Sequence, residues 1–261
     1  MSIQHLHDRT RIESFLRRNP ELHIYSLGDL DDFFWPYTTW YGWQDDGELA
    51  EVAMIYSSRT LPTLVGISQR PAGMRRLLNE IAPLLPEMFY AHLSPGVERA
   101  FTRTHVLESH GPHYKMALRD TSRVRDVDCS GAVPLTLPDS ADLIRLYQES
   151  YPGNWFDLRV LETGQYFGLR QDGRLVSVAG VHVYSERYRV AALGNIVTHP
   201  AYRRRGYARR VMGRLCQSVL EKVEHVGLNV KANNEAATAC YAGLGFEIIA
   251  RYNELTITKT G

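Results

Sequence analysis

The chain has 261 residues, a length that fits one large domain or two small ones, and we expect two. Its 30 basic and 29 acidic residues leave a net charge of +1, which excludes a general electrostatic attraction to nucleic acid or to a membrane, so any cationic function must be local. Without a stretch of transmembrane length, a signal-peptide pattern or metal-ligand spacing among its three cysteines and ten histidines, the sequence predicts a cytoplasmic protein with no metal site.

The first half of the sequence predicts two helices, three strands, and then a helix and further strands. The helical patterns cover 9–18, 23–30 and 71–78, and the strand patterns cover 38–43, 49–56, 63–67, 88–92 and 114–118. Pro71 opens the third helix and therefore removes one backbone N–H from the place where a phosphate would bind. We expect no phosphate site in this half.

A polar segment of alternating charge, 119–128, interrupts the apolar patterns. We place a linker at 120–130 there, between a first domain at 1–119 and a second domain at 131–261.

The second half begins with a strand at 133–137 and a helix capped by Asp139. Strands at 166–169 and 175–184 flank the Asp172-Gly173 pair, which is a strong hairpin signal. The strand at 190–197 is almost continuously apolar, as expected for the centre of a sheet.

Basic residues and a glycine then meet where a strand gives way to a helix, in the run Arg203-Arg204-Arg205-Gly206-Tyr207-Ala208. The following helix is predicted by the buried-face periodicity of Val211, Met212, Leu215, Cys216, Val219, Leu220 and Val223. The free N–H groups and partial positive charge of a helix start, together with Gly206, favour binding of a diphosphate. The alternative is a solvated basic face or a weak nucleic-acid patch.

A second pattern follows this helix. A short strand at 227–231 precedes Asn233-Asn234, which suits a helix cap, and Ala237, Cys240, Tyr241 and Leu244 form one helix face. Gly245 ends the helix and Phe246 begins a strand, and the last two strands are expected at 247–250 and 254–258.

Two motifs in this order resemble the GNAT superfamily of acyl-coenzyme A N-acyltransferases. They are Arg203-x-x-Gly206-x-Ala208, and Asn234-x-x-Ala237-x-x-x-Tyr241 followed by Leu244-Gly245-Phe246. The resemblance implies an α/β fold with a mixed sheet, that is, a GNAT fold, in the C-terminal half. The repeated element order predicts a degenerate GNAT-like domain in the N-terminal half, and an unrelated α+β domain is the alternative.

The resemblance also implies a function. We expect an enzyme that transfers an acetyl or other short acyl group from acetyl-CoA or another acyl-CoA to a primary amine of a small molecule or amino acid. A non-catalytic acyl-CoA-binding module is an alternative, and a transferase that uses aminoacyl-tRNA is disfavoured by the balanced charge. A homodimer stays open, because an oligomerisation role of the N-terminal half would give the same pattern.

Site residues are carried over by position. The cofactor-binding set is Ile196, Val197, Thr198, Arg203, Arg204, Arg205, Gly206, Tyr207, Ala208, Arg209 and Asn234. Tyr241 is expected to protonate the departing thiolate, and Asn195 is either a satisfied bulge residue or a contact at the reacting centre. No carboxylate lies on the strand at 190–194, so Glu162, or His182 acting through water, is the candidate base.

Overall fold

The computed structural model describes residues 2–57, 61–154 and 156–260, and these form two compact units. Unit 1 contains the described residues of 1–115, 230–233 and 248–261, and unit 2 contains those of 116–229 and 234–247. The proposed linker at 120–130 contains a short helix, α4 (Ser122–Arg125). The domain boundaries at 119 and 131 stay a prediction.

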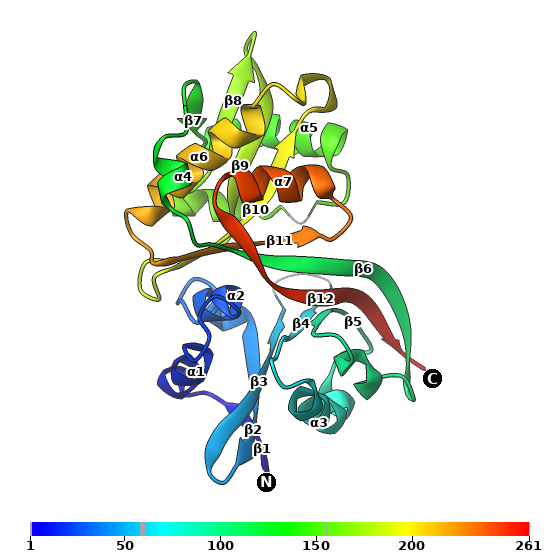
Figure 1. Ribbon diagram of the computed structural model, residues 1–261. Helices are drawn as coiled ribbons and strands as arrows, with labels where there is room; N and C mark the ends of the chain where they lie inside the picture. The colour runs from blue at the N-terminus through cyan, green and yellow to red at the C-terminus, as the bar shows by residue number, and fades with distance from the viewer. Residues whose placement is uncertain (1, 58–60, 155, 261) are drawn as a thin grey trace. The chain divides into compact units, whose positions relative to one another are not determined.

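Unit 1 is a mixed sheet with helices on both sides (Figure 1). Its elements are β1 (Ser2–Leu6), α1 (Arg9–Leu16), α2 (Ile24–Gly28), η1 (Trp35–Tyr37), β2 (Thr38–Asp45), β3 (Glu48–Tyr56), β4 (Thr63–Gly66), α3 (Pro71–Ile81), η2 (Ala82–Leu84), β5 (Met88–Leu93), η3 (Val97–Ala100), and most of β6 (His105–Leu118) and β12 (Phe246–Lys259). Antiparallel pairing joins β1 to β2, β2 to β3, and β3 to β4. β4 then pairs in parallel with β5, and β5 pairs antiparallel with β12.

Unit 2 is built in the same way. Its elements are α4, β7 (Ala132–Pro134), η4 (Leu137–Asp139), α5 (Ser140–Ser150), η5 (Leu158–Thr163), β8 (Phe167–Gln171), β9 (Arg174–Ser185), β10 (Val190–Thr198), η6 (Pro200–Tyr202), α6 (Tyr207–Leu220), most of β11 (His225–Lys231), and α7 (Glu235–Gly243). β7, β8, β9 and β10 pair antiparallel in that order, and β10 pairs in parallel with β11.

The two halves therefore repeat one topology. In each, three antiparallel pairings lead to a strand that is followed by a helix and then by a parallel strand, β4-α3-β5 in unit 1 and β10-α6-β11 in unit 2. The expected α/β class and the tandem order of elements are confirmed.

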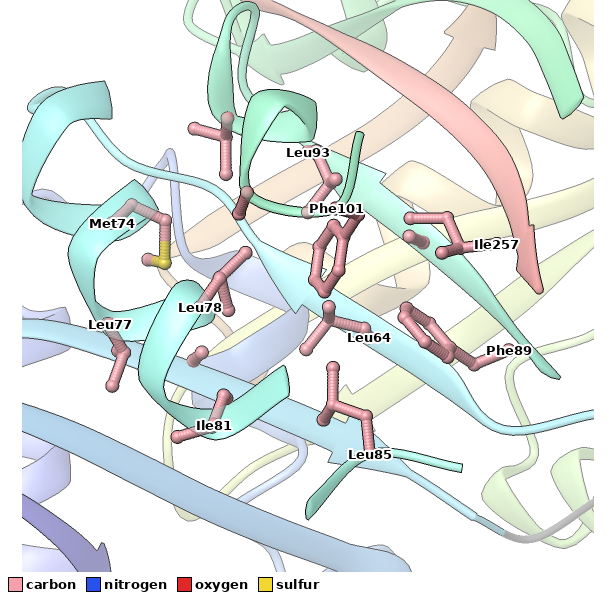
Figure 2. Packing of buried hydrophobic residues seen from close by; sticks show 14 of the residues in the cluster. Leu64, Met74, Leu77, Leu78, Ile81, Leu85, Phe89, Leu93, Phe101 and Ile257 are labelled. Atoms are coloured by element: carbon pink, nitrogen blue, oxygen red, sulfur yellow. The ribbon is translucent and has the colours of Figure 1, made fainter. Parts of the chain in front are cut away.

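The core of unit 1 lies between α3 and the sheet. One face of α3 buries Met74, Leu77, Leu78 and Ile81 at helical spacing, because these positions recur every three or four residues. They belong to one cluster with Leu64, Phe89, Leu93, Phe101 and Ile257, which Figure 2 shows. This packing fixes where α3 begins relative to strand β4.

The opposite side of the unit 1 sheet contains a polar cluster. Glu254 accepts hydrogen bonds from the hydroxyls of Tyr90 and Tyr252, and its carboxylate lies 3.5 Å from Nε2 of His92 and 3.3 Å from Nε2 of His113. Burial lowers the pKa of His92 to about 4, whereas the two imidazoles and the two tyrosine hydroxyls hold the pKa of Glu254 below its usual value despite burial. An ionised carboxylate thus reinforces the pairing of β5 with β12.

Four strand predictions were incomplete or wrong. The strand expected at 133–137 ends at Pro134, because Leu137 begins the 3-10 helix η4. β1 was missed, since the five-residue segment SIQHL lacks apolar alternation and pairs only with β2 among the described strands. β6 begins at His105, nine residues before the predicted start at 114. The two C-terminal strands expected at 247–250 and 254–258 form one strand of 14 residues, β12. In β1, β6 and β12, pairing with a neighbouring strand satisfies the backbone hydrogen-bonding groups of segments whose side chains show no strand pattern.

Candidate active site

The start of α6 has the geometry expected of an anion-binding helix terminus. Gly206 is the N-cap with φ of 79°, a left-handed conformation that favours glycine, and a Cβ placed there would meet nothing within 4 Å. Arg204 also has a positive φ, of 63°. The chain therefore turns sharply into the helix and leaves this end open to solvent.

Backbone donors are available at this helix start. Arg210 N–H donates to the carbonyl of Gly206 over 3.1 Å, which is the first bond of the helix. For the amides of Tyr207, Ala208 and Arg209, no acceptor is recorded among the described residues. Such donors, aligned with the helix dipole, stabilise a negative group placed before the helix.

The predicted arginines do not all face this end. Arg203 Nε donates to the carbonyl of Thr198 over 3.2 Å, and Arg209 Nη1 donates to the carbonyl of Gly243 over 3.0 Å. The Arg205 guanidinium lies over the Tyr202 ring at 5.3 Å. Arg204 is exposed, and no contact of its side chain is recorded within the described part of the chain. We infer that Arg204 is the arginine with most freedom to reach a ligand.

Strand β10 separates from β11 next to the helix start. Parallel pairing covers Val190–Leu193 and His225–Leu228 and then stops, whereas β10 continues to Thr198. The carboxyl end of β10, which carries the predicted Ile196, Val197 and Thr198, therefore has no recorded β11 partner among the described residues. Its backbone groups on that side can bond to a ligand.

A β-bulge at Asn195 shapes this end of β10. Gly194 pairs with Gly180 and Val197 with Val178, so Asn195 and Ile196 oppose the single residue Ala179. Asn195 has φ of 55°, a conformation that asparagine tolerates better than most residues.

Two tyrosines hold the bulge in place. The side-chain amide of Asn195 donates to the hydroxyl of Tyr166 over 2.7 Å, and the Asn195 carbonyl accepts from the hydroxyl of Tyr147 over 3.0 Å. Tyr166 in turn donates to the carbonyl of Val181 over 3.1 Å. These contacts are those of a bulge residue whose polar groups have partners within the protein. Sequence analysis missed Tyr147 and Tyr166, and no local signal marked either one, because both are apolar-face residues in sequence.

We expect Tyr166→Phe to destabilise the protein by about 1–3 kcal/mol, because it leaves the buried amide of Asn195 without its acceptor. Chemical denaturation of both forms measures this. Tyr184→Phe is the matched control, since the Tyr184 hydroxyl donates to Glu186 at an exposed position and its loss should change stability little. Equal stability of the Tyr166→Phe and wild-type proteins would contradict the assigned role.

Helix α7 carries the predicted proton donor. Asn234 is its N-cap, and the side-chain oxygen accepts from the amide of Ala237 over 3.2 Å, so this oxygen serves the helix rather than a ligand. Tyr241 is 8% exposed, and burial raises the pKa of its hydroxyl. Its ring contacts that of Phe246, with 6.2 Å between centroids, and no hydrogen bond of its hydroxyl is recorded in the described segments. A protonated hydroxyl without an internal acceptor is suited to donate to a ligand.

The candidate bases differ in their surroundings. Glu162 is exposed on η5, and no contact of its carboxylate is recorded among residues that the structure describes. His182 is half-buried on β9, with its ring against Gly194 of β10, where any Cβ would collide with the imidazole. His182 therefore lies beside the bulge.

No helix among the described residues is long and apolar enough to cross a membrane. Within the same residues, no group of three or more His, Cys, Asp and Glu side chains could hold a metal ion.

Comparison with known proteins gives a family match for part of the chain and a fold for the whole. Residues 137–246 match the acetyltransferase (GNAT) family. Over 94 residues the chain is 34% identical to an Escherichia coli protein named [ribosomal protein bS18]-alanine N-acetyltransferase. This match covers 36% of the chain and 57% of that relative.

Solved structures resemble the whole chain. An acetyltransferase from the GNAT family from Colwellia psychrerythraea superposes with a TM-score of 0.58 at 13% identity, covering 99% of this chain and 100% of that one. A tandem GNAT protein from the clavulanic acid biosynthesis pathway gives a TM-score of 0.59 at 16% identity and covers 100% of this chain and 99% of that one. At these identities the likeness shows the fold, and it extends over both halves.

Proposed function

We propose that this protein is an N-acyltransferase that uses acetyl-CoA or another short acyl-CoA, because residues 137–246 match the acetyltransferase (GNAT) family. The acceptor in this proposal is a primary amine of a small molecule or amino acid. The reaction takes place in unit 2, in the cytoplasm, without nucleic acid as a partner.

The proposal rests on two features that occur together in unit 2, the start of α6 and the end of β10. The open start of α6 supplies positive charge and N–H groups for which no acceptor is recorded among the described residues, and the end of β10, which pairs with β9 but has no recorded β11 partner there, leads into it through η6. A diphosphate suits the first feature and an extended amide-containing chain suits the second. Coenzyme A combines these two chemical groups in one molecule.

The residues present fit that ligand. The amides of Tyr207, Ala208 and Arg209 and the side chain of Arg204 would hold the diphosphate, with Gly206 leaving space for it. The backbone of Ile196 to Thr198 would bond to the arm that carries the thiol. When bound, acyl-CoA supplies an acyl group already activated as a thioester.

The chain's own residues have two proton tasks. An alkyl amine with pKa near ~10.4 is only about one part in a few thousand neutral at pH 7, so a base must remove its proton. Glu162, or His182 through water, is proposed for this step. Tyr241 is proposed to donate its hydroxyl proton to the departing sulfur.

Asn195 is proposed to position the end of β10. Its contacts with Tyr166 and Tyr147 fix the bulge, and the bulge sets where the end of β10 points. Attack by an amine requires such alignment to within a fraction of an ångström.

The activity test is thiol release from acetyl-CoA with a panel of amines. We expect saturable thiol release with at least one amino acid or small primary amine and none with the matching tertiary amines, because only the former can form an amide. The panel includes a peptide that begins with alanine, because the bacterial relative is named for an alanine of a ribosomal protein. If thiol is released only with this peptide, the acceptor is a protein and not a small molecule.

A non-catalytic acyl-CoA-binding module is the competing function. It is favoured by the absence of a carboxylate on 190–194 of β10. Tight binding of acetyl-CoA with no thiol release across the whole panel would support that function and contradict catalysis.

A further inference from the structure

Helix α3 of unit 1 occupies the same topological position as α6 of unit 2, after the strand that pairs in parallel with the next one. Its N-terminus is therefore the counterpart of the proposed diphosphate site. The helix has 11 residues, with Arg70 as N-cap and Pro71 in the first turn. The two helix starts nevertheless differ in what lies against them.

A buried carboxylate lies against the start of α3. Glu51 of β3 is 2% exposed, and its Oε1 lies 2.8 Å from the position that a Cβ on Gly73 would take. Gly73 stands in the first turn of the helix, so the carboxylate can approach only because this residue lacks a side chain. At α6 the N-cap is Gly206, and a Cβ placed there would meet nothing within 4 Å.

The carboxylate is incompletely satisfied. Its Oε1 lies 3.3 Å from Nε of Arg70 and accepts no well-aligned hydrogen bond from the residues that the structure describes. Burial raises the pKa of Glu51, and contacts with Ser68 and Arg70 offset part of that increase. The fold therefore keeps this carboxyl group buried at some cost, beside the Arg70 guanidinium and the first turn of α3.

The strands of unit 1 also lack the separation seen in unit 2. The whole of β4 pairs with β5, from Thr63 with Tyr90 to Gly66 with Leu93. The contact continues past the strand ends, because the amide of Ser94 donates to the carbonyl of Gly66 over 3.2 Å and the amide of Ser68 donates to Oγ of Ser94 over 2.9 Å. Among the described residues, β4 therefore has no end without a β5 partner that could bond an extended ligand.

We propose that the N-terminus of α3 is an anion-binding site filled by the chain's own Glu51 carboxylate, which excludes the diphosphate of coenzyme A from unit 1. The chain then binds one coenzyme A although its topology contains two such helix starts. Anion binding at α3 does not depend on which amine is the acceptor. Removing the carboxylate should open a site for inorganic pyrophosphate, held by Arg70, the amide of Ala72 and the Ser68 hydroxyl.

The test is calorimetric titration of inorganic pyrophosphate into four full-length proteins: wild type, Glu51→Ala, Gly206→Glu and the double variant. We expect one site per chain in the wild type, two in Glu51→Ala, none in Gly206→Glu and one in the double variant. The new site should bind at least ~10-fold more tightly than any residual binding to Gly206→Glu. The four proteins test the two helix starts separately. A Gly206→Glu protein that still binds one pyrophosphate would disprove the α6 site, whereas a second pyrophosphate bound to Glu51→Ala would still support the α3 site.

Glu48→Ala is the matched control, since Glu48 lies on the same strand, but its side chain is 83% exposed. It should not change the stoichiometry. A folded Glu51→Ala protein that gains no pyrophosphate site would overturn the proposal, as would two coenzyme A molecules bound per wild-type chain.

If the Glu51→Ala protein fails to fold, the melting temperatures of two other variants test the proposal. Gly73→Ala introduces a methyl group in contact with the Glu51 carboxylate and should lower the melting temperature. Glu51→Gln, which removes the buried charge and keeps the shape, should raise it. Helix propensity alone would make Gly73→Ala more stable by up to ~1 kcal/mol, so a variant with that full gain would show that the carboxylate does not fill the helix start.

Discussion

The Gly206→Glu variant is expected to bind acetyl-CoA at least ~100-fold more weakly than the wild-type protein. The substitution places a carboxylate before the amides of Tyr207, Ala208 and Arg209, where the proposed diphosphate would lie. Like charges repel there, and the new side chain also fills the space that the glycine leaves open. Isothermal titration calorimetry with acetyl-CoA measures the change, and circular dichroism shows whether the variant is folded.

The matched control is Gly173→Glu. Gly173 has φ of 78°, close to the 79° of Gly206, and a Cβ on either residue meets nothing within 4 Å. The same strain and the same charge are thus introduced in the β8–β9 turn. This control should bind acetyl-CoA like the wild type, whereas unaltered affinity of a folded Gly206→Glu protein would remove α6 as the diphosphate site.

Replacement of Tyr241 by phenylalanine is expected to lower kcat by ~100-fold or more and to change the acetyl-CoA affinity little. The ring remains to pack against Phe246, so the substitution removes only the hydroxyl. Burial raises the pKa of this hydroxyl, so it stays protonated across neutral pH and can act as a donor. Steady-state thiol release and acetyl-CoA titration together separate the two quantities.

The other interpretation of Tyr241 is a packed core residue. In that case the phenylalanine variant would retain its turnover rate and lose thermal stability instead. Tyr188→Phe serves as the control, because Tyr188 is another buried tyrosine of unit 2 and its loss should leave kcat unchanged.

The sequence alone determined the features that depend on neighbouring residues. Helix α6 begins at Tyr207, one residue after the glycine near which its start was predicted, and its buried face is the predicted one. The Asn234 cap of α7 and the strand pattern of β8 to β10 were also predictable. Each depends on periodicity, a capping side chain or a turn dipeptide within a few positions, so local physics suffices.

Only the tertiary structure decided which distant groups meet. Asn195 lies 29 positions from Tyr166 and 48 from Tyr147, yet their hydrogen bonds define the bulge. Glu51 was indistinguishable in sequence from any strand glutamate until the β3–β4 pairing and the packing of α3 placed it at a helix start. Sheet register and burial fix such contacts, and a buried polar group takes the partner that register brings to it rather than one encoded beside it in the chain.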